Sequence, residues 1–146
     1  IADALRRLDV RVAPATGSAP VEELGPLPQA WLVREFLPQV RLLAASSVAV
    51  THGGNNSVTE ALTAGVPLLV LPFSTDQFAG AAAIERTGVG VCLDPNATTS
   101  GDIADAVRHL LNPGGARSAA AAIGEGLREV PGPQRARAAV RQALSG

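Results

Sequence analysis

A chain of 146 residues with 47% hydrophobic and 17% charged side chains can fold as one globular domain, and this composition excludes a disordered protein. A net charge of −1 at pH 7 argues against binding nucleic acid or anionic membranes, and one cysteine excludes an internal disulfide. The longest apolar runs, such as residues 66–73, are too short to cross a bilayer.

The first stretch, residues 2–8, has a helical composition and no strand precedes it. The chain opens at Ile1 instead of Met and carries no signal-peptide pattern, so we expect a cytoplasmic protein. Since parallel-sheet domains usually begin on a strand, we also expect the sequence to be a piece of a longer polypeptide.

Short apolar runs then alternate with helical periodicity as far as residue 93. Five runs are predicted to be strands: Val10–Pro14, Trp31–Glu35, Val48–Thr51, Leu68–Leu71 and Val89–Leu93. Three helices are predicted between them: Val40–Ala45, Ser57–Ala64 and Gln77–Thr87. Residues 16–28 are rich in Pro, Gly and Glu and are expected to form a loop. This alternation is typical of an α/β fold, with a parallel sheet covered by helices on both faces.

After residue 96 the strands stop and a helical C-terminal tail is predicted. Its helices are Thr99–Leu111, capped by Thr98 or Thr99, then Ala116–Glu129 and Gln134–Leu144. One domain spanning residues 1–146 is therefore expected.

The stretch THGGNNSVTE, residues 51–60, joins a predicted strand to a predicted helix. Its central part, residues 52–57, consists of one histidine, two glycines and three short polar residues: His52, Gly53, Gly54, Asn55, Asn56 and Ser57. In parallel α/β sheets, ligands bind where strands end and helices begin, and a helix N-terminus attracts anions. A diphosphate held by amides, hydroxyls and the histidine is one interpretation. A plain helix N-cap, which Asn or Ser supplies alone, is the other.

Further candidate groups fall at the same end of the predicted sheet. Glu60 can accept hydrogen bonds from ribose hydroxyls, but alone it is more simply a favourable first-turn carboxylate. Asp76 and Gln77 suit a polyhydroxylated sugar, or Asp76 is the N-cap of its helix. Phe36 is either a surface on which a base stacks or a core residue.

Two other kinds of site are disfavoured. Ser57, His52 and Asp76 lack the G-x-S-x-G context of a hydrolase. Two histidines without clustered carboxylates do not predict a metal site, so no metal or cofactor is expected, and His109 is expected at the surface.

The ordered motifs resemble the donor-binding signature of family 1 glycosyltransferases, the UDP-glycosyltransferase superfamily. They are Phe36-Leu37-Pro38-Gln39, THGGNNSVTEAL from residue 51, Gly65-Val66-Pro67, Pro72 and Asp76-Gln77. The family set is W-x-P-Q, H-x-G-x-N-S-x-x-E, G-V-P and D-Q, and this chain departs from it only at the Trp. The resemblance covers nearly the whole chain. It implies the Rossmann-like, donor-binding half of a GT-B fold, without that half's first strand.

The resemblance also implies which residues bind the donor: Phe36, Gln39, His52, Gly53, Gly54, Asn56, Ser57, Glu60, Asp76 and Gln77. The loop after the strand would meet the pyrophosphate, with Asn56 and Ser57 on phosphate oxygens. Glu60 and Gln39 would hold the ribose, and the Asp-Gln pair would bind hydroxyls of the sugar. Phe36 would stack on the base, a role not given to Trp31 inside its predicted strand.

By the same resemblance, the whole enzyme would be an inverting, metal-independent hexosyltransferase. It would pass a sugar from UDP-hexose or dTDP-hexose to a small lipophilic acceptor, as in antibiotic biosynthesis. The general base would lie in an N-terminal acceptor domain absent from this sequence, so no residue here is expected to be catalytic. The partners implied are the nucleotide-sugar donor and, through the absent domain, the acceptor, with no nucleic acid and no membrane insertion; a homodimer is left open.

Two rival functions fit the same sequence. One is a non-catalytic nucleotide-sugar-binding module, or the donor subunit of a split glycosyltransferase. The other, a nucleotide-sugar epimerase of similar architecture, is disfavoured by the Asp-Gln pair. The sequence leaves the choice between UDP and dTDP open.

Overall fold

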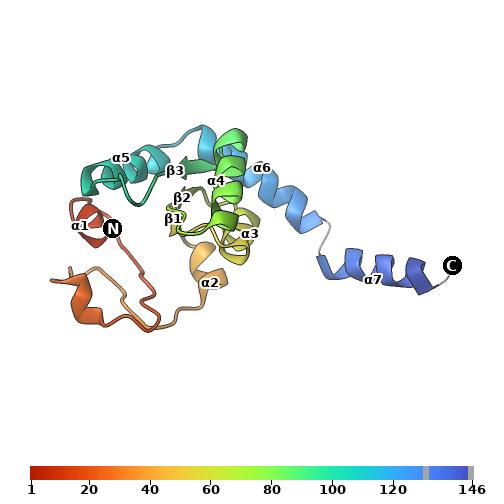
Figure 1. Ribbon diagram of the computed structural model, residues 1–146, viewed down its shortest axis with the longest axis horizontal. Helices are drawn as coiled ribbons and strands as arrows, with labels where there is room; N and C mark the ends of the chain where they lie inside the picture. Colours follow the sequence, from red (N-terminus) through yellow and green to blue (C-terminus); the bar gives the residue numbers. More distant parts are fainter. Residues whose placement is uncertain (130–131, 145–146) are drawn as a thin grey trace.

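A small parallel sheet lies between layers of helices in the computed structural model (Figure 1). The structure describes residues 1–129 and 132–144, without the side chains of residues 75, 76, 79, 133–135 and 138. The strands follow the order β1-β2-β3 and are all parallel: β1 (Ala49–Thr51), β2 (Leu68–Val70) and β3 (Gly90–Cys92). The register pairs Thr51 with Val70 and Val70 with Cys92, so the strands end together at one edge of the sheet. The predicted α/β class is confirmed.

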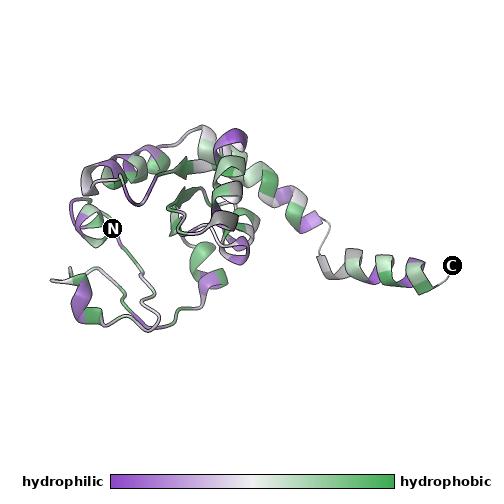
Figure 2. Cartoon of the chain, in the orientation of Figure 1, coloured by the Kyte–Doolittle hydropathy of each residue, from purple (hydrophilic) through white to green (hydrophobic). Residues whose placement is uncertain are grey.

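The central strand, β2, is buried on both faces because successive side chains of a strand point to opposite sides. Leu69 and Leu71 pack in a core cluster with helices of one layer, α1 (Ala2–Leu5) and α5 (Ser100–Leu111). Leu68 and Val70 pack in a second cluster with the other layer: α2 (Gln39–Leu43), α3 (Asn55–Thr63), α4 (Thr75–Thr87) and α6 (Gly115–Glu129). The three strands are accordingly mostly hydrophobic (Figure 2). Helices cover both faces, as predicted.

Two of the five predicted strands are wrong: Val10–Pro14 and Trp31–Glu35 are not strands. The two segments run beside each other, and Leu32 N donates to Val12 O at 2.9 Å while Arg34 N donates to Pro14 O at 3.3 Å. The pairing ends in an isolated parallel bridge between Ala15 and Arg34. Because proline has no N–H group, Pro14 cannot donate the next hydrogen bond, and the pair does not extend into a ladder.

The predicted helices are all present, with ends shifted by a few residues. The one at the start of the chain is shorter than predicted, ending at Leu5, and the predicted loop 16–28 contains a short 3-10 helix, Val21–Leu24. The helical tail is confirmed as α5, α6 and α7 (Gly132–Leu144), and α7 projects away from the sheet (Figure 1). Thr99 caps α5 in a capping box with Asp102. Across the described ranges, no helix is long and apolar enough to cross a membrane.

Candidate functional site

Two loops at the carboxyl edge of the sheet meet each other. The first leads from β1 into α3 and the second from β2 into α4, and these strands are neighbours. A Cβ atom placed on Gly53, in the first loop, would lie 3.8 Å from the backbone oxygen and 3.9 Å from the Cβ of Gln77, in α4. The start of α4 therefore lies against the loop that precedes α3.

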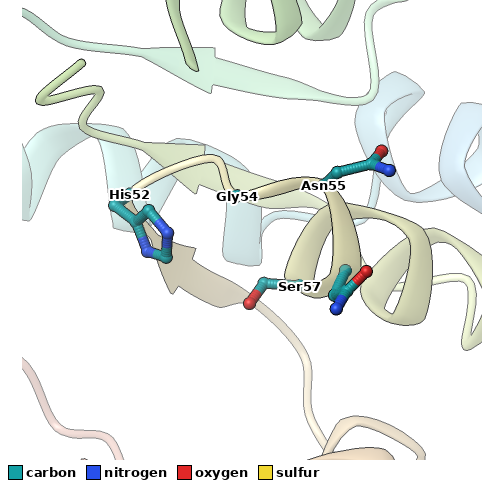
Figure 3. Close-up of a pocket in the computed structure, with 5 residues that line it drawn as sticks. His52, Gly54, Asn55 and Ser57 are labelled. Atoms are coloured by element: carbon teal, nitrogen blue, oxygen red, sulfur yellow. The ribbon is translucent and has the colours of Figure 1, made fainter. Parts of the chain in front are cut away.

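A side chain at either loop glycine would meet a different neighbour. Gly53 has a φ of +88°, where other residues are strained, and a Cβ there would come within 2.8 Å of Cγ1 of the fully buried Val70. Gly54 has an ordinary φ of −60°, but its Cβ would lie 2.5 Å from Nε2 of His52. The missing side chain at Gly54 lets the imidazole lie against the start of α3 (Figure 3).

Helix α3 begins without a side-chain cap. Gly54 occupies the N-cap position, and the helix starts at Asn55, two residues before the predicted Ser57. The first backbone bond into the helix runs from Val58 N to Gly54 O at 3.0 Å. The amides of Asn55, Asn56 and Ser57 therefore have no hydrogen-bond partner among the described residues. Interpreting these polar residues as a plain N-cap is wrong, because they lie inside the first turn.

The first three residues of this helix, with His52 and Gly54, line a small open pocket with a volume of about 370 Å³. The residues that line it all belong to the predicted loop: His52, Gly54, Asn55, Asn56 and Ser57. Of these, only Asn55 was not among the residues predicted to bind the donor. In Figure 3 the imidazole and the Ser57 hydroxyl lie on the same side of the helix start, and the Asn55 amide points away from them.

The structure brings together the two residues predicted to hold a ribose. Gln39, the first residue of α2, donates from Nε2 to Oε2 of Glu60 at 2.7 Å. Glu60 lies in the second turn of α3, since that helix starts at Asn55 and has no acidic residue in its first turn. The interpretation of Glu60 as a first-turn carboxylate is therefore wrong.

The Asp-Gln pair lies near the start of α4, which is capped by another residue. Ser74 is the N-cap and forms a capping box with Gln77, so the interpretation of Asp76 as the cap is wrong. Oε1 of Gln77 accepts from the backbone N–H groups of Phe73 at 2.7 Å and Ser74 at 3.2 Å. The Gln77 oxygen is thus engaged by the cap, which leaves Nε2 to meet a ligand. The side chain of Asp76 lies outside the described residues.

Phe36 is 79% exposed, which overturns its interpretation as a core residue and leaves a ring face open to a base. Trp31 is partly buried against the first core cluster, and the Arg6 guanidinium lies 5.9 Å from its ring centroid. Phe73, from sequence the end of the apolar run 66–73, is 68% exposed where β2 leads into α4. Phe73 follows Pro72 and lies beyond the end of β2 at Val70. This position in the sequence is the feature that could have indicated that Phe73 is not a core residue.

The remaining titratable groups add no second site in the part of the chain that the structure describes. His109 is exposed on α5, as predicted. Across residues 1–129 and 132–144, no three His, Cys, Asp or Glu side chains gather where they could hold a metal ion. Burial, with a contribution from the Glu85 carboxylate, raises the pKa of Cys92 to about 11, so this thiol is protonated at neutral pH.

Residues 1–142 match the family described as erythromycin biosynthesis protein CIII-like, C-terminal domain. Among curated relatives, an uncharacterized UDP-glucosyltransferase, YojK of Bacillus subtilis, is 30% identical over 122 residues, covering 84% of this chain and 30% of the relative. A PGL/p-HBAD biosynthesis glycosyltransferase of Mycobacterium tuberculosis is 34% identical over 125 residues, covering 86% of this chain and 29% of the relative.

Solved structures of glycosyltransferases also match almost the entire chain. The calicheamicin glycosyltransferase CalG4 superposes with a TM-score of 0.88 at 30% identity, covering 99% of this chain and 38% of that one. The glycosyltransferase VinC, solved in complex with dTDP, superposes with a TM-score of 0.89 at 26% identity, covering 99% of this chain and 37% of that one. The present chain thus spans about a third of the length of the proteins that it matches.

Proposed function

Because this chain belongs to the family of erythromycin biosynthesis protein CIII-like C-terminal domains, in the GT-B glycosyltransferases, we propose that it binds the nucleotide-sugar donor of a hexosyltransferase. The observation that carries the proposal is the uncapped start of α3. Helices α4 and α5 each begin with a capping box, but no side chain caps α3, and its first three amides have no hydrogen-bond partner among the described residues. A diphosphate supplies the acceptor oxygens that these amides lack.

We assign residues to the other groups of the donor, starting from the diphosphate. Within the pocket, His52, Asn56 and Ser57 add side-chain hydrogen bonds to the phosphates. The Gln39–Glu60 pair receives the ribose, and Phe36 stacks on the base. The start of α4, with Asp76 and Gln77, receives the sugar. UDP and dTDP both suit this arrangement, and the relatives include a named UDP-glucosyltransferase and a structure with dTDP.

In the reaction that we propose, an acceptor oxygen attacks the anomeric carbon of the sugar with inversion. The bond from that carbon to the diphosphate breaks, and the leaving diphosphate keeps the electron pair. The free amides of α3 and the His52 imidazole stabilise the charge that grows on this leaving group, a role for which we invoke no metal ion. The proton of the acceptor goes to a base outside this chain, in a longer protein whose acceptor we propose to be small and lipophilic.

Calorimetric titration with UDP and dTDP tests the proposal. His52→Ala and Glu60→Ala should each weaken binding by about tenfold or more, because each removes a hydrogen bond that involves a charged group. The chain offers matched controls in His109→Ala and Glu125→Ala, whose side chains are exposed on α5 and α6. These controls should bind like the wild type. A folded protein that binds neither nucleotide would contradict the proposal, as would four variants with equal affinities.

A further inference from the structure

We infer that helix α6 acts as a brace for α3, and that Arg128, near the end of α6, is a positioning residue for the diphosphate site. The inference rests on the proposed function and adds to it what holds the free amides in place before any nucleotide binds. It starts from the packing of α6 against the helix that carries the pocket.

Helix α3 needs support from outside itself. It has nine residues and no side-chain cap at its start. Isolated helices of this length are marginal in water. The free amides at the start of a helix point along its axis, so a tilt or fraying of α3 would move all three of them at once.

Helix α6 meets the end of α3 backbone to backbone. A Cβ atom on the buried Gly124 would lie 2.3 Å from the backbone oxygen of Leu62 and 3.3 Å from the backbone nitrogen of Gly65. A Cβ atom on Gly65, which follows the C-cap of α3, would lie 3.3 Å from Cα of Ala121. Ala120 of α6 is fully buried in the core cluster that also contains residues of α3. Small residues therefore let the two backbones touch.

Two arginines of α6 hold the two ends of the segment that carries the site. Nη1 of Arg128 donates to the backbone oxygen of Thr63, the last residue of α3. Nη1 of Arg117 donates to the backbone oxygen of Ser47, two residues before β1, at 3.3 Å. The segment between these two carbonyls contains β1, the loop and α3. At the C-terminus of α3, the guanidinium supplies a donor and a positive charge where the last carbonyls of a helix lack partners.

Arg128 can act on the nucleotide only through α3. Thr63 lies eight residues after Asn55, so the bonded carbonyl is about 12 Å along the helix from the free amides. At physiological salt, a charge at that distance is largely screened. The effect that remains is mechanical: a helix held at its end presents its amides already aligned, which lowers the entropy lost when the diphosphate binds.

Calorimetric titration with UDP tests the role of Arg128. Arg128→Ala should weaken UDP binding by about three- to tenfold, because α3 must then be ordered as the nucleotide binds. Arg128→Lys keeps a cationic donor at the same place and should retain most of the affinity. Arg108→Ala is the matched control, since it removes an exposed arginine from α5, on the opposite face of the sheet, and should bind UDP like the wild type.

The ¹⁵N spectrum of the nucleotide-free protein separates positioning from general stability, because it reports on the folded state alone. In Arg128→Ala the amide resonances of Asn55, Asn56 and Ser57 should shift or broaden, although they lie at the other end of α3. The amide of Asp102, in the capped first turn of α5, should keep its position. At saturation with UDP, the three resonances should return to the positions of the wild-type complex.

Gly124→Ala perturbs the brace in a second way. Its Cβ would meet the backbone oxygen of Leu62, so α6 must move away from α3, and UDP binding should weaken at least as much as in Arg128→Ala. Gly126→Ala, two residues further along α6 where a Cβ meets nothing within 4 Å, should bind UDP like the wild type. If Gly124→Ala does not fold, Arg128→Ala decides the question, because Arg128 is exposed and its truncation creates no clash.

Any of three results would overturn the inference while leaving the donor site in place. They are wild-type affinity in folded Arg128→Ala, Arg128→Lys no better than Arg128→Ala, and a loss of affinity with unchanged resonances of Asn55, Asn56 and Ser57 in the free protein. The proposed function fails separately: wild-type protein that binds neither UDP nor dTDP would overturn both.

Discussion

Gly54→Ala should lower the affinity for UDP and dTDP by about a hundredfold and leave the fold intact. The added Cβ would lie 2.5 Å from Nε2 and 3.1 Å from Cε1 of His52, so the imidazole must leave its place against the start of α3. The methyl group also stands beside the three free amides that a diphosphate must approach. Because Gly54 has a φ of −60°, alanine adopts the same backbone without strain.

Calorimetry for binding and thermal unfolding for stability check this prediction together. Gly126→Ala is the matched control, because it makes the same change at an exposed position of α6 where a Cβ would meet nothing within 4 Å. The control should keep the wild-type affinity and gain up to about 1 kcal/mol of stability from helix propensity. Unchanged binding by folded Gly54→Ala protein would show that the diphosphate does not approach this part of the loop.

Leu69→Ala should lower the free energy of unfolding by about 2–5 kcal/mol. Leu69 is fully buried in the central strand and belongs to the core cluster that joins the sheet to α1 and α5. Deleting its side chain leaves a cavity that β2 cannot close, since both of its neighbours are paired strands. The effect is large for a domain of this size, because total stabilities are only about 5–15 kcal/mol.

Urea denaturation followed by circular dichroism measures this change. Leu127→Ala removes the same atoms from a side chain that is 39% exposed on α6, and should cost less than half as much. Since β2 leads into α4 and pairs with the strand before α3, Leu69→Ala should also lower the temperature at which nucleotide binding is lost. Equal losses for the two leucines would contradict the assignment of β2 as the centre of the core.

Local signals predict the parts of the fold that depend on a few neighbouring residues. The helix periodicity, the cap at Thr99 and the buried run around Leu69 each belong to one segment and are confirmed. The N-terminal strands failed because a strand exists only if its partner's N–H and C=O groups continue the ladder. Pro14 interrupts that ladder, and the sequence does not show which segment would be the partner.

The candidate site was likewise predicted from the sequence only in part. Two glycines and several polar residues after a strand predict a ligand-binding loop. They do not identify the N-cap, because the N-cap and the first turn of a helix differ by only one or two residues along the chain. Only the structure shows that the cap is Gly54, which leaves the amides free. The bond between Gln39 and Glu60 joins different helices, so no spacing rule predicts it. The exposure of Phe36 likewise depends on what the rest of the chain covers.

An amide NMR titration of ¹⁵N-labelled protein with UDP or dTDP tests the central claim most directly, because it reports on the groups said to bind the diphosphate. The largest shifts should fall on the amides of Asn55, Asn56 and Ser57, moving in the direction of stronger hydrogen bonding as saturation proceeds. Shifts that leave these three amides unchanged while the protein is saturated with nucleotide would contradict a diphosphate site at the start of α3.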